Sequence, residues 1–425
     1  SFILARQHFY MLSGLVLITA ALWLYYRDYA ASRNVIHLRG LFCLFFVGGQ
    51  GISCFKLSRL QGDWSIETWI CLGLAVAAFW AVFEVLTRLF DGWSADDMES
   101  VYRFYASAES PFQAKRLLHS MAGLVAVSYA AFFFEAWKLG FVPLFSYGVP
   151  HAYSYFHVSG VHYFTVSCVL VPSLFVVYSL MVSRRGRGLS RDRGFWLGAV
   201  CVVLALAVPV LCVSRFQLIL AVGMAAFTYI SMAGNIRPGY VVILFGCMVP
   251  AYLALTVMRS HSVEYLNGIF EMKNSHMPIF VTQPYMYIAN NYDNFNCLVE
   301  QLPSHTLGLR MLFPVWALTG LKFLVPSLVN FPLFVTKKEL TTLTLFYDAY
   351  YDFGVIGMML LGALLGAACY YLVKARRNLR CPAGHVFYAQ IAMYMMLSFF
   401  TTWFSNPATW FYLVVTGIIY IYVRS

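Results

Sequence analysis

The stretch GVIGMMLLGALLGAACYYLV (354–373) decides the fold class, because it holds no charged side chain over its whole length. Roughly 20 apolar residues in a helix cross a hydrocarbon core of about 30 Å. Comparable runs recur at 8–26, 41–55, 66–86, 117–137, 161–183, 195–213, 216–234, 239–258, 353–373, 386–403 and 408–423. We therefore predict an all-α polytopic membrane protein, a single transmembrane domain over 1–425 with about eleven transmembrane helices and a range of ten to twelve.

The composition agrees with this class. Of 425 residues, 61% are hydrophobic and 11% are charged, whereas a soluble domain carries about a quarter charged residues. The net charge of +11 comes from Lys and Arg in loops between apolar runs, which indicates retention on the cytoplasmic side and not nucleic-acid binding. The ten cysteines show no disulfide or metal-ligand spacing, so we expect neither a metal nor another cofactor.

Loop charge predicts the topology. The basic loops RRGRGLSRDRG (184–194) and KARRNLR (374–380) belong in the cytoplasm. That assignment puts 18 of the 29 Lys and Arg residues inside and only 5 in short outside segments. The remaining segment, 259–352, then leaves and re-enters on the outside. Its apolar part, 311–327, therefore cannot be one full crossing, and it is short and contains Pro314 and Pro326. We expect re-entrant or interfacial helices in one large, partly membrane-embedded external loop.

Three arginines stand alone at the predicted outer boundary: Arg215, Arg259 and Arg310. A guanidinium group binds phosphate oxygens in pairs and stays charged, so these residues are candidates for binding a diphosphate. The alternative is that they extend to lipid headgroups as anchors. His261, two residues after Arg259, is either a general base or an ordinary surface histidine.

The segment PYMYIANNYDNFNCL (284–298) mixes aromatic rings with amide groups. Sugars present hydroxyls that need donors and acceptors, and C–H faces that lie on aromatic rings. We therefore predict sugar contacts here, made by Tyr287, Asn290, Asn291, Tyr292 and Asp293. The alternative is an interfacial aromatic belt with asparagine caps.

The segment FYDAYYDFGVIG (346–357) places two acids at the start of an apolar helix. Asp348 and Asp352 are four residues apart and share a helix face, and Tyr347 and Tyr351 share the adjacent one. Either acid is a candidate general base, and the two tyrosines are candidate sugar contacts. Asp352 also suits a helix cap, while GALLG (362–366) is a small-residue packing face.

Four motifs together resemble the Wzy-type oligosaccharide repeat-unit polymerases of bacterial surface polysaccharide synthesis. They are GFVPLF (140–145), SRFQLIL (214–220), YIANNYDNF (287–295) and TTLTLFYDAYYDFGVIG (341–357), in the family's order within roughly 138–370. The resemblance implies a fold of the GT-C type, shared in outline with O-antigen ligases. It implies an enzyme of O-antigen or lipopolysaccharide biosynthesis in the bacterial plasma (inner) membrane, with its active site facing the periplasm.

The implied reaction is a metal-independent glycosyl transfer between oligosaccharide units linked to undecaprenyl diphosphate. Lipid-linked oligosaccharides, membrane lipids and a separate chain-length regulator are the implied partners. One feature departs from the related ligases, which carry a histidine before the equivalent of DFGVIG. Here the neighbourhood reads LTTLTLFYD (340–348) with no histidine, which weakens the ligase interpretation and leaves the base open.

Two alternatives stay open. One is an O-antigen ligase or another lipid-linked glycosyltransferase of the GT-C type. The other is a lipid-linked oligosaccharide flippase or small-solute transporter, a class in which internal repeats and polar groups at the membrane midplane are common. The chain shows no evident repeat, and its polar clusters fall in the external segment, which favours the polymerase.

Overall fold

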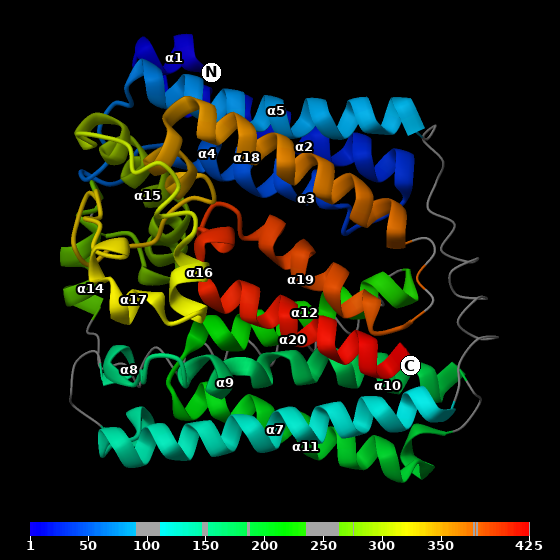
Figure 1. Cartoon of the computed structure of the whole chain (residues 1–425). Coiled ribbons are helices and arrows are strands. Elements are labelled where there is room, and N and C mark those ends of the chain that lie inside the picture. Colours follow the sequence, from blue (N-terminus) through cyan, green and yellow to red (C-terminus); the bar gives the residue numbers. More distant parts are fainter. Residues whose placement is uncertain are drawn as a thin grey trace. The chain divides into compact units, whose positions relative to one another are not determined.

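The computed structural model describes residues 1–90, 111–146, 152–184, 188–234, 263–274, 276–376, 379 and 381–424. Within these ranges every named element is a helix, and the single extended pairing is a bridge between Ser58 and Met272 (Figure 1). Eight of the described helices are long and apolar enough to span a membrane: Tyr10–Ser32, Ile66–Phe90, Phe112–Leu139, His162–Arg184, Arg193–Leu211, Arg215–Ala233, Tyr347–Arg376 and Pro407–Arg424. The prediction of an all-α polytopic membrane protein is confirmed.

Three of the eleven predicted spans are not among these eight. The span at 239–258 lies outside the described residues. The span at 41–55 corresponds to α3 (Leu38–Phe42), the π-helical η1 (Cys43–Val47) and α4 (Gly48–Ser53), which follow one another without a break. The span at 386–403 corresponds to α19 (Gly384–Met396), which has 13 residues. Both are shorter than a standard crossing.

The chain divides into two compact units. Unit 1 comprises Ser1–Asp96, Ser262–Lys374 and Tyr394–Trp410, and unit 2 comprises Asp97–His261, Ala375–Met393 and Phe411–Ser425. Each unit is assembled from segments far apart in the sequence, and each is described separately.

Glycine packing joins two long helices of unit 1, α5 (Ile66–Phe90) and α18 (Tyr347–Arg376) (Figure 1). A methyl group at Gly362 would lie 2.6 Å from the carbonyl oxygen of Ala75, and one at Gly366 would collide with the carbonyl oxygen of Phe79. The absence of a Cβ therefore lets the two backbones touch, as predicted for the GALLG segment. Ile356, Leu360 and Leu364 form an exposed apolar stripe on α18, suited to lipid.

The remaining helices of unit 1 come from its N-terminal part and the long predicted loop. They are α1 (Phe2–Arg6), α2 (Tyr10–Ser32), α14 (Val263–Phe270), α15 (Ile279–Gln301), α16 (Phe313–Leu318), α17 (Leu321–Leu324) and the 3-10 turns η5 (Pro326–Leu328) and η6 (Trp403–Ser405). Helices α16 and α17 and turn η5, which cover most of 311–327, are each too short to cross a bilayer. Helix α15 packs against α4 and α14.

Unit 2 is a helical bundle with its own apolar core. Its helices are α7 (Pro111–Leu139), α8 (Ala152–Tyr155), α9 (His162–Val166), α10 (Val171–Arg184), α11 (Arg193–Leu211) and α12 (Arg215–Ala233), with most of α19 and of α20 (Pro407–Arg424). The 3-10 turns η2 (Pro143–Phe145), η3 (Ser167–Leu170) and η4 (Leu189–Arg191) connect them. Helix α10 packs against α7, α11 and α12, and its Val171, Leu174 and Met181 are buried in this core.

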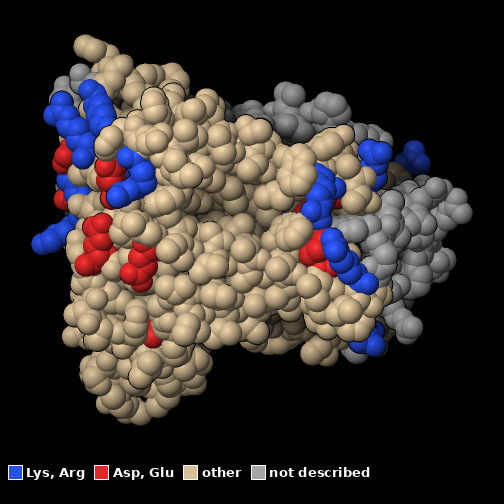
Figure 2. All heavy atoms as spheres, turned by 90° about the horizontal axis from the view of Figure 1, so that it is seen from above, with Lys and Arg blue, Asp and Glu red and all other residues tan. Residues whose placement is uncertain are grey.

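Figure 2 shows one face of the molecule, on which charged side chains gather at two opposite edges. The wide area between these edges carries uncharged residues. Such a distribution suits a protein surrounded by hydrocarbon, because a charged side chain in the bilayer core is costly.

Candidate functional site

The polar turn that opens α18 is separated from the apolar part of the helix by a break at Gly354. This residue has φ 60° and ψ −145°, a conformation that only glycine adopts without strain. The break lies two residues after Asp352. The acids and tyrosines of 347–352 therefore belong to a short helical turn, and the spanning helix continues beyond it.

Asp348, in this turn, forms an ion pair with Arg310, which lies about forty residues earlier in the chain. The Arg310 Nε–H donates to Asp348 Oδ1, and only 14% of the arginine side chain and 5% of the aspartate side chain are exposed. Burial alone would lower the pKa of Arg310, but Asp348 reverses this and raises the pKa above its ordinary value. The guanidinium is therefore charged and already holds a carboxylate.

Asp352 anchors the segment that carries Arg310. It accepts hydrogen bonds from the Thr306 hydroxyl, from the Arg310 backbone N–H at 3.1 Å and from the Met311 backbone N–H at 2.7 Å. Asp352 is fully buried. With both oxygens occupied by donors, its role is to position the 306–311 turn over α18.

Tyr347 and Tyr351 lie beside the Arg310–Asp348 pair. The Arg310 guanidinium carbon lies 4.6 Å from the Tyr351 ring centroid and 5.4 Å from that of Tyr347, both within cation–π range. The Tyr347 hydroxyl donates to the Phe334 carbonyl and accepts from the Phe334 N–H, each at 2.9 Å. Both rings are buried. The structure thus brings five predicted site residues together: Arg310, Tyr347, Asp348, Tyr351 and Asp352.

A histidine that we did not predict lies at this break. A methyl group at Gly354 would lie 2.9 Å from His305 Nε2, and His305 Nδ1 lies 3.3 Å from the Tyr351 carbonyl oxygen. Because a carbonyl only accepts, Nδ1 is the donor in this contact. The sequence around 340–348 holds no histidine, and nothing local indicates that residue 305 folds back to this point.

The predicted sugar-contact residues of α15 are mostly inside unit 1. Asn290, Asn291, Tyr292 and Asp293 are each at most 3% exposed, and Tyr287 is partly exposed. Asn291 donates to the carbonyls of Tyr287 and Phe399 at 2.6 and 2.7 Å.

The same helix holds the chain that leads to α18. Asn290 accepts from the Thr336 hydroxyl at 2.9 Å, and Asn294 donates to the carbonyls of Leu340 and Thr342 at 2.7 and 2.9 Å. Thr342 in turn donates to Asn291 at 2.5 Å. The asparagines of YIANNYDNF therefore fix the course of 336–342.

Asp293 lies on another side of α15, against the 53–64 segment. It accepts from Trp64 Nε1 and Gln61 Nε2, each at 2.8 Å, and from the Ser53 hydroxyl at 3.3 Å. Burial raises the pKa of Asp293, although Lys56 and these donors oppose the rise.

The other predicted site residues are not placed with this cluster. Arg215 is the first residue of α12, is 7% exposed and belongs to unit 2. Arg259 and His261 lie outside the described residues. Their assignments to diphosphate binding and catalysis stay predictions. Within the described residues, no group of three or more His, Cys, Asp or Glu side chains is placed to hold a metal ion.

Unit 2 contains a carboxylate–histidine pair that the motif analysis missed. Glu135 is fully buried on α7 and accepts from the Thr165 hydroxyl at 2.7 Å and the Val158 N–H at 2.9 Å. His162 Nδ1 lies 3.1 Å from the same carboxylate. An acidic residue inside an apolar run is by itself a candidate for a functional site, and this criterion could have identified Glu135.

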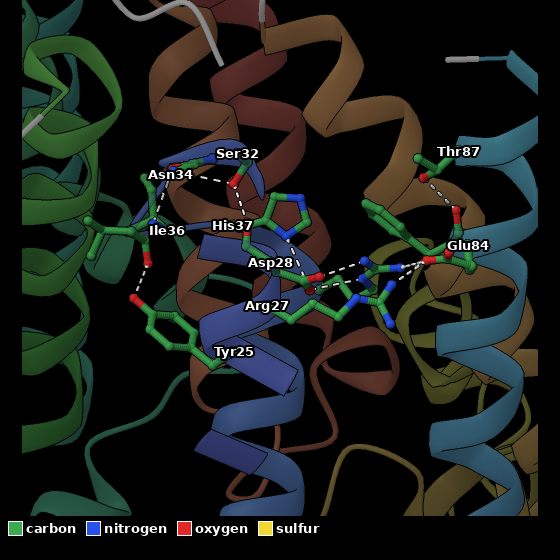
Figure 3. Close-up of polar contacts among 12 residues, drawn as sticks. Tyr25, Arg27, Asp28, Ser32, Asn34, Ile36, His37, Glu84 and Thr87 are labelled. Carbon is green, nitrogen blue, oxygen red and sulfur yellow. Dashed lines mark hydrogen bonds and ion pairs between the residues drawn. The ribbon is translucent and has the colours of Figure 1, made fainter. Parts of the chain in front are cut away.

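A second buried charge network lies in unit 1 (Figure 3). Arg39 donates to both oxygens of Asp28, at 2.5 and 2.9 Å, and to Glu84 at 2.9 Å. Glu84 also accepts from Arg27 at 2.7 Å and from Arg88 at 3.0 Å. The network joins α2, α3 and α5. By the loop-charge topology it lies at their cytoplasmic ends.

No protein-family model, no curated protein and no solved structure matches the chain. The functional proposal therefore depends on the membrane-spanning helices, the motifs and the geometry around Arg310.

Proposed function

We propose that the chain is a metal-independent glycosyltransferase that polymerises oligosaccharide repeat units carried on undecaprenyl diphosphate. The observation that carries the proposal is the buried Arg310–Asp348 pair, set among tyrosines at the mouth of a membrane-spanning helix. It combines a cation for a diphosphate with a carboxylate for a hydroxyl proton in one place, next to the apolar surface that a prenyl chain needs.

The pair suggests how the two halves of the reaction are coupled. A diphosphate that takes Arg310 competes with Asp348 for the guanidinium, since Arg310 binds phosphate and carboxylate by the same N–H geometry. Release of Asp348 leaves a buried carboxylate with an accessible lone pair. Asp348 then accepts the proton of the acceptor hydroxyl as that oxygen forms the new bond to the anomeric carbon.

The same step breaks the bond between the anomeric carbon and the diphosphate oxygen. The electron pair leaves with undecaprenyl diphosphate, and Arg310 stabilises the charge that develops there. Arg215 and Arg259 are proposed as further cations for this leaving group. Asp352 is assigned to positioning, because its three hydrogen bonds hold the Arg310 turn.

The test is complementation in a bacterial strain from which the gene has been deleted, with lipid-linked glycans separated by size. Wild-type protein should restore long chains, and Arg310→Met should give glycan capped by a single repeat unit. The matched control is Lys322→Met, which removes a cation elsewhere in unit 1, beside the Phe323 ring, and should leave chain length unchanged. Long chains from Arg310→Met would overturn the assignment of Arg310. Arg215→Met tests the second predicted cation in the same way.

The same strain separates the two alternatives. A flippase predicts that deletion strands single repeat units on the cytoplasmic side, whereas a polymerase leaves them on the outer side. A ligase predicts that long lipid-linked chains still form but are not transferred to their final acceptor. Either result would favour the corresponding alternative over the polymerase.

A further inference from the structure

Unit 1 contains a pocket that the motif analysis did not identify. Its volume is about 220 Å³, and its walls come from residues 5–10, at α1 and the start of α2, and from residues 54–69, which run from the end of α4 into α5. Ligand clefts for drug-sized molecules measure about 300–1,000 Å³. A pocket of this size accommodates one monosaccharide residue and not a whole repeat unit.

Two tryptophans form the apolar part of the wall. The ring centroids of Trp64 and Trp69 are 5.1 Å apart, with 50° between the ring planes. Trp64 is held in place from behind, because its Nε1–H donates to Asp293 at 2.8 Å and its ring stacks on Tyr292. Trp64 is only 4% exposed, whereas Trp69 is partly exposed. Trp64 therefore supports Trp69, which presents the accessible aromatic surface of the pocket.

The remaining wall carries hydrogen-bonding groups. The Tyr10 hydroxyl donates to Asp63 Oδ1 at 2.6 Å and lies 2.6 Å from His8 Nδ1. His8 and Asp63 are exposed, so their outer atoms are accessible to a ligand. A donor–acceptor chain beside aromatic rings matches the alternating hydroxyls and C–H faces of a sugar.

Lys56 gives the pocket its charge preference. It is only 6% exposed, its ammonium donates to the Gly62 carbonyl, and it lies 5.3 Å from the Trp64 ring centroid and 5.6 Å from that of Tyr10. In the described part of the chain no carboxylate lies within ion-pair distance of its nitrogen. Its charge also acts on the buried carboxylate of Asp293. Arg6 adds a second cation at the edge of the pocket, so the lining holds two cations and one carboxylate, Asp63, and this excess of positive charge favours an anionic ligand.

We infer that this pocket binds a carboxylated sugar residue, with the sugar ring on Trp69 and the carboxylate toward Lys56 and Arg6. The identification of that sugar as part of the transferred glycan rests on the proposed function. The binding itself does not, because aromatic rings, a hydrogen-bonding chain and a buried cation select an acidic sugar whatever the protein does with it.

The test is binding of a glucuronic-acid disaccharide and of the corresponding neutral glucose disaccharide to the full-length protein in nanodiscs, followed by calorimetry and saturation-transfer NMR. The acidic ligand should bind at least tenfold more tightly, because a charge-assisted hydrogen bond contributes about 1.5–3 kcal/mol. Lys56→Met keeps the apolar stem of the side chain. It should lower the affinity for the acidic disaccharide to that for the neutral one. Trp69→Ala should weaken both.

Two matched controls accompany these variants. Lys322→Met removes another lysine of unit 1 that lies beside an aromatic ring, and Trp137→Ala removes a tryptophan of unit 2 that is 79% exposed. Neither should change binding. Thermal unfolding checks that Lys56→Met is folded, and the loss of a buried charge should leave its midpoint unchanged or raised.

The inference is overturned if the two disaccharides bind equally, if neither binds to the wild type, or if Lys322→Met has the same effect as Lys56→Met. Displacement of the acidic disaccharide by equimolar inorganic phosphate would also overturn it, since the pocket would then be a general anion site. Binding without polymer formation in the strain would refute the proposed function and leave the pocket intact. Polymer formation without binding would refute the pocket assignment and leave the proposed function intact.

Discussion

Asp348 and Asp352 lie four residues apart on one helical turn but have different roles. Asp352 is fixed by three donors from the 306–311 turn, whereas Asp348 has one charged partner, Arg310. The spacing in the sequence treats the two acids alike. Only the partners, brought from about forty residues away, make one of them an anchor and the other an exchangeable carboxylate.

The Arg310–Asp348 pair should show strong coupling in a double-mutant cycle. Asp348→Leu leaves a buried guanidinium without its carboxylate and should cost about 3 kcal/mol of stability. Arg310→Met combined with Asp348→Leu removes both charges and should cost less than Asp348→Leu alone. Thermal unfolding in detergent measures all variants. A double variant as unstable as the sum of its single changes would show that the two residues act independently.

Asp293 should make stability depend on pH. Burial raises the pKa of Asp293 above its ordinary value of 3.8, so the folded state holds this proton more tightly than the unfolded state does. The free energy of unfolding should therefore fall as the pH rises from 3.8 to the raised pKa, and stay level above it.

The matching variant is Asp293→Asn, which should remove that fall in the unfolding midpoint. Glu300→Gln changes an exposed acid of the same helix and serves as the control, with the wild-type profile expected. A wild-type midpoint that rises over this interval relative to that of Asp293→Asn would contradict the sign of the shift.

Among the helices, α18 has a break at Gly354 that separates its polar turn, which carries the candidate catalytic residues, from the apolar part that is long enough to span a membrane. The residues before Gly354 form the polar turn, and those after it present Gly362 and Gly366 to α5. The small-residue packing was predictable, because it follows from spacing within one helix. The break was not, since a glycine in an apolar run is also compatible with a straight helix.

Gly354→Ala should destabilise the protein by about 1–3 kcal/mol, because alanine disfavours φ 60° and its methyl group would lie 2.9 Å from His305. Gly73→Ala on α5 meets no atom within 4 Å and should be neutral or stabilising by up to about 1 kcal/mol. Thermal unfolding of both variants tests the difference. Equal effects would mean that the break carries no strain for a side chain.

Helix α15 shows what its sequence could not indicate, for a physical reason. Its Tyr, Asn and Asp residues have the chemistry of a sugar site, but that same chemistry also satisfies the backbone of neighbouring segments. Asn291 and Asn294 donate to carbonyls of the 336–342 and 399 regions, and a single sequence carries no record of such distant partners. Residue type indicated that hydrogen bonds form there, and only the fold shows with what.

At the scale of the whole molecule, hydrophobic run length predicted the class and most of the helices. Eight of the eleven predicted spans coincide with described helices long enough to cross a membrane. The division into two units was not predictable, because each unit combines three segments that are far apart in the sequence. Pattern along the chain identifies helices, whereas their grouping depends on contacts between residues hundreds of positions apart.

The predicted topology can be checked on one helix. Gly62, just before α5, is exposed, and Leu89 near its end is 70% exposed. If α5 crosses outward to inward, a membrane-impermeant thiol reagent should label Gly62→Cys in intact cells and Leu89→Cys only after permeabilisation. Wild-type protein gives the background, since eight of the nine cysteines in the described residues are buried. Labelling of Leu89→Cys in intact cells would reverse the orientation.

The charge network of Figure 3 has a consequence for biogenesis. Asp28, Arg39 and Glu84 lie on three helices that leave the ribosome at different times, and each charge costs about 2.5–3.5 kcal/mol when a helix centre carries it alone into the bilayer. Residues nearer the helix ends cost less, and Asp28 can pair with Arg39 once α2 and α3 are present, but the Arg39–Glu84 pair forms only after α5 has joined them. The first ninety residues should therefore leave the translocon as a group, with α2 retained there until Glu84 of α5 has been synthesised.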